Sequence, residues 1–225
     1  MRLYFKLVGI CVVAIGFSVA AAGAFDDFFR ALKQDRPDVI QGLLERGFEP
    51  NAPDPQGLDA LFVALRDGSL KSAQVLIDWP KTNVDVRNPN DETPLMMACL
   101  KGQADMARRL VARGADVNKT GWTPLHYAAT GGHVEIMRML LDQNAYIDAE
   151  SPNGTTPLMM AARYGSDAAV KFLLSAGADP TLKNQLGMTA ADFANGVSRQ
   201  DLAKDLRQAA QGFASRYPKP PSVRP

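Results

Sequence analysis

Residues 121–141 read GWTPLHYAATGGHVEIMRMLL, and the Thr-Pro-Leu near their start recurs along the chain. The same triplet stands at 93–95 and 156–158, and a decayed version stands at 189–191. If the third residue of each triplet is taken as a marker, the equivalent positions are Phe28, Leu61, Leu95, Leu125, Leu158 and Ala191. The intervals are 33, 34, 30, 33 and 33 residues. A period of this length indicates stacked copies of one supersecondary unit.

The residue types within one unit predict two short helices. Thr123 is a favourable N-cap, and Pro124 suits the first helical position because no amide donor is needed there. Gly132 ends the first helix, since glycine adopts the left-handed conformation without steric cost. The apolar stripe of the second helix consists of Val134, Ile136, Met137, Leu140 and Leu141. Helices this short are marginal alone, so neighbouring units must stabilise them.

This pattern resembles the ankyrin repeat, in which a β-hairpin turn is followed by two antiparallel helices. The resemblance covers residues 25–217 and implies an all-α repeat solenoid of about six stacked ankyrin repeats. The predicted units lie near 25–55, 56–90, 91–120, 121–153, 154–186 and 187–217. The end units are degenerate and the last is rich in polar residues, as expected of caps that face water.

Residues 1–24 have the three parts of a secretory signal peptide. Arg2 and Lys6 form a basic start, residues 7–17 are apolar and uncharged, and Ala-Gly-Ala precedes the predicted cleavage after Ala24. We expect a mature protein in the bacterial periplasm, with no membrane attachment after cleavage. Two alternatives stay open. Residues 7–25 approach the length of about 20 that a bilayer span needs, so they could be retained as an inner-membrane anchor. The protein could also be delivered outside the cell.

The charge balance and the cysteine content exclude some functions. Removal of residues 1–24 takes away two positive charges and moves the formal net charge from +1 to −1. That balance implies no basic face for nucleic acid. Cys99 is the one cysteine left after cleavage, so no internal disulfide can form. Residues 218–225 are Pro-rich and are predicted to be a disordered tail.

The sequence predicts no catalytic residues, no cofactor and no metal site. His126 and His133 stand where the ankyrin pattern itself places histidine, which leaves no Ser/His/Asp or Cys/His set. Phosphate-cradling glycine motifs are absent. Methionines could bind Cu(I), but those at equivalent positions of successive repeats are separated by the roughly 8–10 Å between packed helices. They are therefore expected to pack in the core. A small-molecule or metal carrier remains the alternative of another class.

The resemblance implies a protein-binding scaffold that uses the concave face formed by hairpin tips and first helices. The variable positions there lie three residues before each marker and five or six after it. The predicted partner-binding residues are Trp122, Leu100, Lys101, Arg163, Tyr164, Arg66, Thr130, Glu92 and Thr155. Exposed Trp, Tyr and Arg are the residue types that most often dominate interface energy. We expect a monomer that binds a protein partner whose identity the sequence does not indicate.

The 30-residue interval shortens one turn beside these residues. Asn118 reaches Gly121 through Lys119 and Thr120 alone, so three residues are missing from the turn that precedes Trp122. Loops tolerate such length changes, which favours simple variation. The other interpretation is a notch among the hairpin tips, shaped for a partner. Both interpretations remain open at this point.

These observations together predict a non-enzymatic interaction scaffold of the bacterial periplasm. The main alternative is the same repeat domain held at the inner membrane, where it would support an envelope enzyme. Ankyrin proteins of the bacterial envelope are associated in some lineages with catalase, so the resemblance suggests peroxide defence as one context for that alternative.

Overall fold

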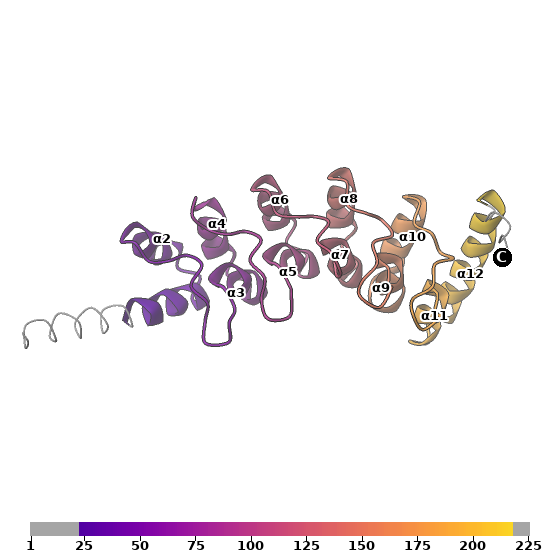
Figure 1. The fold of residues 1–225 in the computed structure, drawn as a ribbon, viewed down its shortest axis with the longest axis horizontal. Coiled ribbons are helices and arrows are strands. Elements are labelled where there is room, and N and C mark those ends of the chain that lie inside the picture. Colours follow the sequence, from indigo (N-terminus) through magenta and orange to yellow (C-terminus); the bar gives the residue numbers. More distant parts are fainter. Residues whose placement is uncertain (1–22, 218–225) are drawn as a thin grey trace, which may run out of the picture. The chain divides into compact units, whose positions relative to one another are not determined.

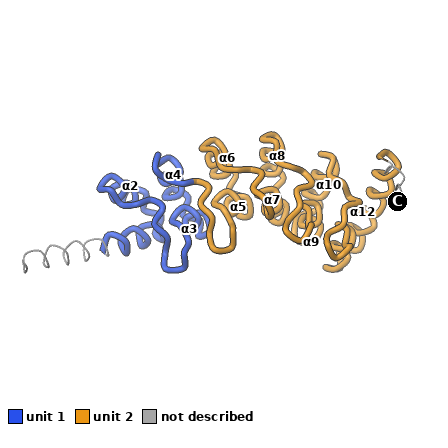
Figure 2. Tube along the Cα trace, in the orientation of Figure 1, with its two compact units in different colours: residues 1–83 blue, residues 84–225 orange. Residues whose placement is uncertain are grey.

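The computed structural model describes residues 23–217. The predicted tail, 218–225, and nearly all of the predicted signal peptide lie outside these residues. Within them every regular element is a helix, accompanied by an isolated bridge between Pro53 and Asp59. The chain divides into two compact units, residues 1–83 and 84–225 (Figure 2). The predicted all-α repeat architecture is therefore confirmed in each unit.

The first unit contains two helix pairs (Figure 1). A helix over 23–33 precedes α2 (Pro37–Glu45), and α3 (Ala60–Asp67) precedes α4 (Leu70–Asp78). The markers Phe28 and Leu61 are both buried, as the period predicts. Phe28 also stacks on Phe48, with ring centroids 4.2 Å apart. The core of this unit therefore lies where the repeat pattern places it.

The second unit contains four helix pairs. They are α5 (Pro94–Leu100) with α6 (Ala104–Ala112), α7 (Pro124–Gly131) with α8 (Val134–Asp142), α9 (Pro157–Tyr164) with α10 (Asp167–Ser175), and α11 (Ala190–Asn195) with α12 (Gln200–Arg216). The first helices α5, α7, α9 and α11 pack on one another in order and form one row, with the second helices beside them (Figure 1). Because every marker in this row is buried, the row is the core of the unit.

The Thr-Pro pair begins α5, α7 and α9 as expected. Thr93 Oγ1 accepts the amide hydrogen of Met96 at 3.3 Å, and Thr156 Oγ1 accepts that of Met159 at 3.4 Å. Each threonine stands at an N-cap in extended conformation, and the proline follows in the first turn. The caps satisfy amides that a helix start leaves without a partner.

Most repeats begin with a five-residue turn that closes on itself. Asn88 donates its amide to the Glu92 carbonyl at 3.0 Å, and residues 151–155 and 184–188 close in the same way. Side-chain oxygens at the first position then accept amides of the same turn, as Asn184 Oδ1 does from Met188 at 3.0 Å. The turn before α7 is three residues shorter, and a lysine described below holds it instead.

Successive repeats are also joined by a row of side chains that accept amides from the next repeat. Asn118 Oδ1 accepts the amide of Tyr146 at 2.8 Å, and Asn118 Nδ2 donates to the Asn144 carbonyl at 2.8 Å. Asp148 stands at the equivalent position and accepts the amide of Asp179 at 3.1 Å. Burial raises the pKa of Asp148 above its usual range, and the nearby Asp179 carboxylate raises it further. A carboxylate is thus less suited to this position than the asparagine of the preceding repeat.

We expect Asp148→Asn to stabilise the protein at pH 7.5 by about 0.5–1 kcal/mol. This is the net contribution of the hydrogen bond that the asparagine NH2 group would add, as Asn118 Nδ2 does in the preceding repeat. Because the folded-state pKa of Asp148 is raised, the wild-type protein gains stability as the pH falls and this group becomes protonated. The advantage of the variant should therefore shrink towards pH 4.5. Urea unfolding of both proteins at the two pH values measures the effect, with Asn118→Asp as the reverse control. An Asp148→Asn variant that is less stable than the wild-type protein at both pH values would contradict this account.

Candidate functional site

The first helices of the second unit share a repeated pattern on one face. Residues two and five positions after each marker lie one helical turn apart, so they occupy the same side of the helix. The pairs are Met97 and Leu100 on α5, Tyr127 and Thr130 on α7, and Met160 and Arg163 on α9. These side chains form the first-helix face of the second unit, the name used for this surface below.

A hollow of about 220 Å³ lies on the first-helix face. It is lined by Leu100, Trp122, His126, Tyr127, Thr130 and Met160. Leu100, Trp122 and Thr130 were predicted from the sequence as contact residues, and the structure brings these three together. Met160 is one of the methionines expected to pack in the core, and Tyr127 occupies the equivalent position on α7. Both residues are half-buried and line the hollow. Their shared position two residues after the marker is the sequence signal that could have indicated this role.

Trp122 forms one wall of the hollow. Its ring meets the edge of the His126 ring, with centroids 5.2 Å apart and planes at 77°. The residue is half-buried, so part of the indole faces solvent. Trp122 stands three residues before the marker Leu125, as predicted for a contact position. It therefore combines a fixed orientation with an accessible surface.

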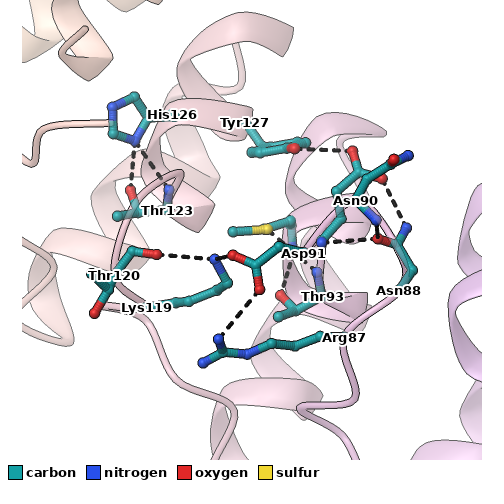
Figure 3. A network of polar contacts seen from close by, with 12 residues as sticks. Arg87, Asn88, Asn90, Asp91, Thr93, Lys119, Thr120, Thr123, His126 and Tyr127 are labelled. Atoms are coloured by element: carbon teal, nitrogen blue, oxygen red, sulfur yellow. Dashed lines mark hydrogen bonds and ion pairs between the residues drawn. The ribbon is translucent and has the colours of Figure 1, made fainter. Parts of the chain in front are cut away.

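His126 lies under the hollow and has a structural role. Its Nδ1 accepts the amide hydrogen of Thr123 at 3.1 Å (Figure 3), which leaves Nε2 as the donor to the Thr155 carbonyl at 2.8 Å. The side chain is fully buried, and burial lowers the pKa of His126 to about 4. The imidazole is therefore neutral at pH 7 and ties α7 to the next turn. This confirms the interpretation of His126 as part of the repeat.

Tyr127 is held in place by a carboxylate from the preceding repeat. Its hydroxyl donates to Glu92 Oε1 at 2.9 Å, and Asn88 Nδ2 donates to Glu92 Oε2 at 2.8 Å (Figure 3). Burial raises the pKa of Tyr127, and the hydrogen bond to Glu92 raises it further. Glu92 was predicted as a contact residue, and in the structure both of its oxygens orient side chains of the chain itself.

The shortened turn before Trp122 is anchored by a buried lysine. Lys119 is 2% exposed, and its ammonium group donates to the Thr120 carbonyl at 3.0 Å and to the Asp91 carboxylate. Asp91 also accepts a hydrogen bond from Arg87 Nη1 at 3.3 Å (Figure 3). The bond from Lys119 holds the pKa of Asp91 below its usual range. A specific ion pair thus stands where other repeats have a five-residue turn.

Two more predicted residues extend the face beyond the hollow. Lys101 follows Leu100 and is exposed. Tyr164 is 57% exposed, and the Arg163 guanidinium lies 5.2 Å from the centre of its ring. Arg163 is half-buried, and its Nε is buried without a hydrogen-bond partner in the described chain. These residues add cationic and aromatic surface next to the hollow.

Two predicted residues do not belong to this surface. Thr155 is 2% exposed, so its side chain offers no contact area, and its carbonyl is occupied by His126. The prediction of Thr155 followed from its position in the repeat, which does not reveal burial. Arg66 belongs to the first unit, where it pairs with Asp67 at 2.7 Å. It lines a separate hollow of about 460 Å³ in that unit.

Two observations concern the cysteine and metal ligands of the described residues. Cys99 is fully buried, and burial raises the pKa of its thiol, which keeps it protonated. Between residues 23 and 217, no three His, Cys, Asp or Glu side chains are grouped as metal ligands. Over the same range, no helix is both long and apolar enough to cross a bilayer.

The geometry is that of a helix-pair repeat protein with an apolar hollow on its first helices. A family model described as ankyrin repeats (3 copies) matches residues 28–120 and 115–184. The chain therefore belongs to the ankyrin repeat family. Proteins of this family are typically interaction modules, and their stacked repeats provide extended binding surfaces.

Relatives from distant organisms share this architecture. The chain is 30% identical to Protein glp-1 of Caenorhabditis elegans over 80% of its own length and 15% of the relative. It is 28% identical to an ankyrin repeat-containing protein of Treponema pallidum, over 76% of this chain and 58% of that one. The chain thus spans less than two thirds of the length of these relatives.

A solved structure is similar over nearly the whole of its matched chain. That chain belongs to a structure described as a predatory endopeptidase from Bdellovibrio bacteriovorus in complex with an immunity protein. The two chains are 31% identical with a TM-score of 0.69, over 81% of this chain and 97% of that one.

His126→Met should separate the structural role of His126 from its charge. Methionine occupies the equivalent positions 96 and 159, where Met159 Sδ accepts the Thr156 amide at 3.4 Å. At pH 7.5 we expect a loss on the order of 1 kcal/mol, because the bond to the Thr155 carbonyl disappears. Below pH 6.5 the wild-type protein should lose stability progressively down to about pH 4, since unfolding frees an imidazole that takes up a proton.

This pH-dependent loss, on the order of 2–3 kcal/mol, should be absent in the variant. Burial raises the pKa of Asp59 to about 6, which gives an opposite slope, so the difference between the two proteins is the informative quantity. Urea unfolding between pH 4.5 and 7.5 provides it. Parallel pH profiles for the two proteins would refute a neutral, buried His126.

Proposed function

We propose that this protein is a non-enzymatic scaffold that captures a protein partner on the first-helix face of its second unit. The observation that carries the proposal is the apolar hollow between Leu100, Trp122 and Met160, with Tyr164 exposed on the same row of helices. Large aromatic and aliphatic side chains around a hollow are typical of the centre of a protein interface. The family assignment supports the same type of activity.

The size of the hollow favours a protein partner over a small molecule. Sites for small molecules commonly enclose about 300–1,000 Å³ and bury most of the ligand. A hollow of about 220 Å³ is smaller than that range and is open to solvent on the first-helix face. It has the size to receive a side chain projecting from another protein. At this hollow a small molecule is therefore the weaker candidate.

An exported enzyme is the partner class that we propose first. The solved relative comes from a complex described as an endopeptidase with an immunity protein. The similarity covers 97% of that chain, so its whole repeat architecture has a counterpart here. A peptidase bound and restrained by this scaffold is the most specific form of the proposal. The alternative, support of an envelope enzyme by an anchored protein, shares the same binding surface.

We further propose that the protein acts in the bacterial periplasm. The proposal depends on residues 1–24, whose basic start, apolar centre and small-residue end match a secretory signal peptide. An exported scaffold without disulfides is physically reasonable, because each repeat buries its faces against its neighbours.

Photo-crosslinking in cells tests the binding surface. A photoreactive residue at position 101 or 164, both exposed, should give adducts with one dominant protein, identified by mass spectrometry. Trp122→Ala should reduce these adducts at least about tenfold, the usual effect of removing an interface anchor. Because Trp122 is half-buried, circular dichroism must show that this variant remains helical.

Position 171 on α10 provides the matched control. Lys171 is exposed but lies on a second helix, so a crosslinker there should give no adduct with the same protein. Adducts from position 171 in place of 101 and 164 would move the binding surface to the second helices. No adduct from any position, with the protein exported and folded, would refute the scaffold function.

Cell fractionation followed by N-terminal sequencing tests the location. We expect the protein in the fraction released by osmotic shock, with Phe25 as its first residue. Recovery of the full-length chain in the membrane fraction would instead establish the anchored alternative. Recovery of the mature protein in the medium would indicate delivery outside the cell.

A further inference from the structure

We infer that the hollow on the first-helix face receives one apolar side chain that the partner carries directly beside a carboxylate. This inference rests on the proposed function and specifies the chemistry of the element that the partner presents. Three properties of the hollow support it: the state of its polar atoms, its size, and the unpaired donors around it.

Apart from the Trp122 indole nitrogen, the polar side-chain atoms that line the hollow are already satisfied within the chain. The Tyr127 hydroxyl donates to Glu92, and both nitrogens of His126 have partners. The Thr130 hydroxyl donates to the His126 carbonyl at 2.8 Å. A polar group that entered would give up water without gaining a hydrogen bond, which is unfavourable. The hollow therefore selects an apolar occupant.

The dimensions restrict this occupant to a single side chain. Leu100 and Met160 come from neighbouring first helices on either side of Tyr127, and Trp122 forms a further wall. About 220 Å³ between them suits a side chain such as leucine, methionine or phenylalanine. Such an anchor, surrounded by weaker contacts that exclude water, is the usual form of an interface hot spot.

Three hydrogen-bond donors, one on Trp122 and two on residues that follow lining residues along the chain, make no hydrogen bond within the described chain. The Nε of Arg163 is buried and unpaired, and Arg163 follows Met160 by one helical turn. In residues 23–217 neither the Trp122 indole nitrogen nor the Lys101 ammonium group makes a hydrogen bond. All three groups can only donate, and two of them are cationic. An acceptor with negative charge complements them best, since charge-assisted hydrogen bonds are the stronger kind.

The carboxylates of this region are not available to those donors. Glu92 accepts hydrogen bonds from Tyr127 and Asn88 on its two oxygens. Asp91 is paired with Lys119 and with Arg87. The positive charge of Lys101 and Arg163 is thus left without an internal counterpart, and the complementary partner segment is acidic. A basic segment, attracted by Glu92, is the opposite outcome that an experiment must distinguish.

Fluorescein-labelled heptapeptides provide the test, with binding to the full-length protein measured by fluorescence anisotropy. The first peptide has the sequence Gly-Ser-Glu-Leu-Glu-Ser-Gly. The second replaces both glutamates with lysine, and the third replaces the leucine with alanine. We expect the Glu-Leu-Glu peptide to bind at least about tenfold more tightly than either of the others.

Variants of the protein assign each preference to its residues. The double variant Lys101→Gln, Arg163→Gln should abolish the preference for glutamate over lysine and keep the preference for leucine over alanine. Trp122→Ala should abolish both. Arg138→Gln is the matched control, because Arg138 is an exposed arginine that lies over Phe172 on the second helices. It should change neither preference. The double variant leaves every residue that lines the hollow unchanged, so the test does not depend on whether Trp122→Ala folds.

Equal or tighter binding of the lysine peptide would overturn the inference, as would a charge preference that survives the double variant. Absence of binding by every peptide would overturn it as well. The crosslinking experiment separates these failures from failure of the scaffold function. If a partner is crosslinked from positions 101 and 164 but the protein shows no preference for the glutamate peptide, the proposed binding surface is correct and its proposed occupant is wrong.

Discussion

No helix pair in this protein can bury its apolar face alone, and the rest of the structure follows from that constraint. Most of the helices in the described chain have six to nine residues, too few to be stable in isolation. Each first helix of the second unit therefore packs on the first helix of the next repeat, with a buried residue such as Leu125 at the centre. Small side chains such as Ala128 and Ala129 allow this close approach.

The same packing produces the candidate binding surface. A first helix packs on its neighbours with one side, and the residues two and five positions after the marker lie on another side. Leu100 and Met160 remain partly exposed there, whereas Met97 is buried. Tyr127 is then fixed by Glu92 from the preceding repeat, so the hollow has a defined shape before any partner arrives. A preorganised surface loses less conformational entropy on binding.

The repeat period, the helix caps and the buried markers could all be predicted from the sequence, because each depends on residues close together in the chain. Trp122 and Leu100 could be placed beside the first helices for the same reason. The burial of Thr155 could not be predicted, because it depends on packing between residues far apart in the chain, as does the bond from His126 to the Thr155 carbonyl. Likewise, Tyr127 and Met160 could be read as core residues until packing showed how much of each remains accessible. The ion pair of Lys119 with Asp91 joins residues 28 positions apart and left no local signal.

That ion pair also restricts how this gene can change by duplication. Repeat arrays commonly gain or lose whole units. If the units are interchangeable, the duplicated or deleted segment can begin at any position within the period. Here a boundary placed between Asp91 and Lys119 would separate the two charges and leave a buried ammonium group without its counterion, a costly arrangement. Breakpoints that copy or delete residues 91–119 together are the ones that keep this ion pair. The segment should be inherited as one block, even where neighbouring repeats have been exchanged.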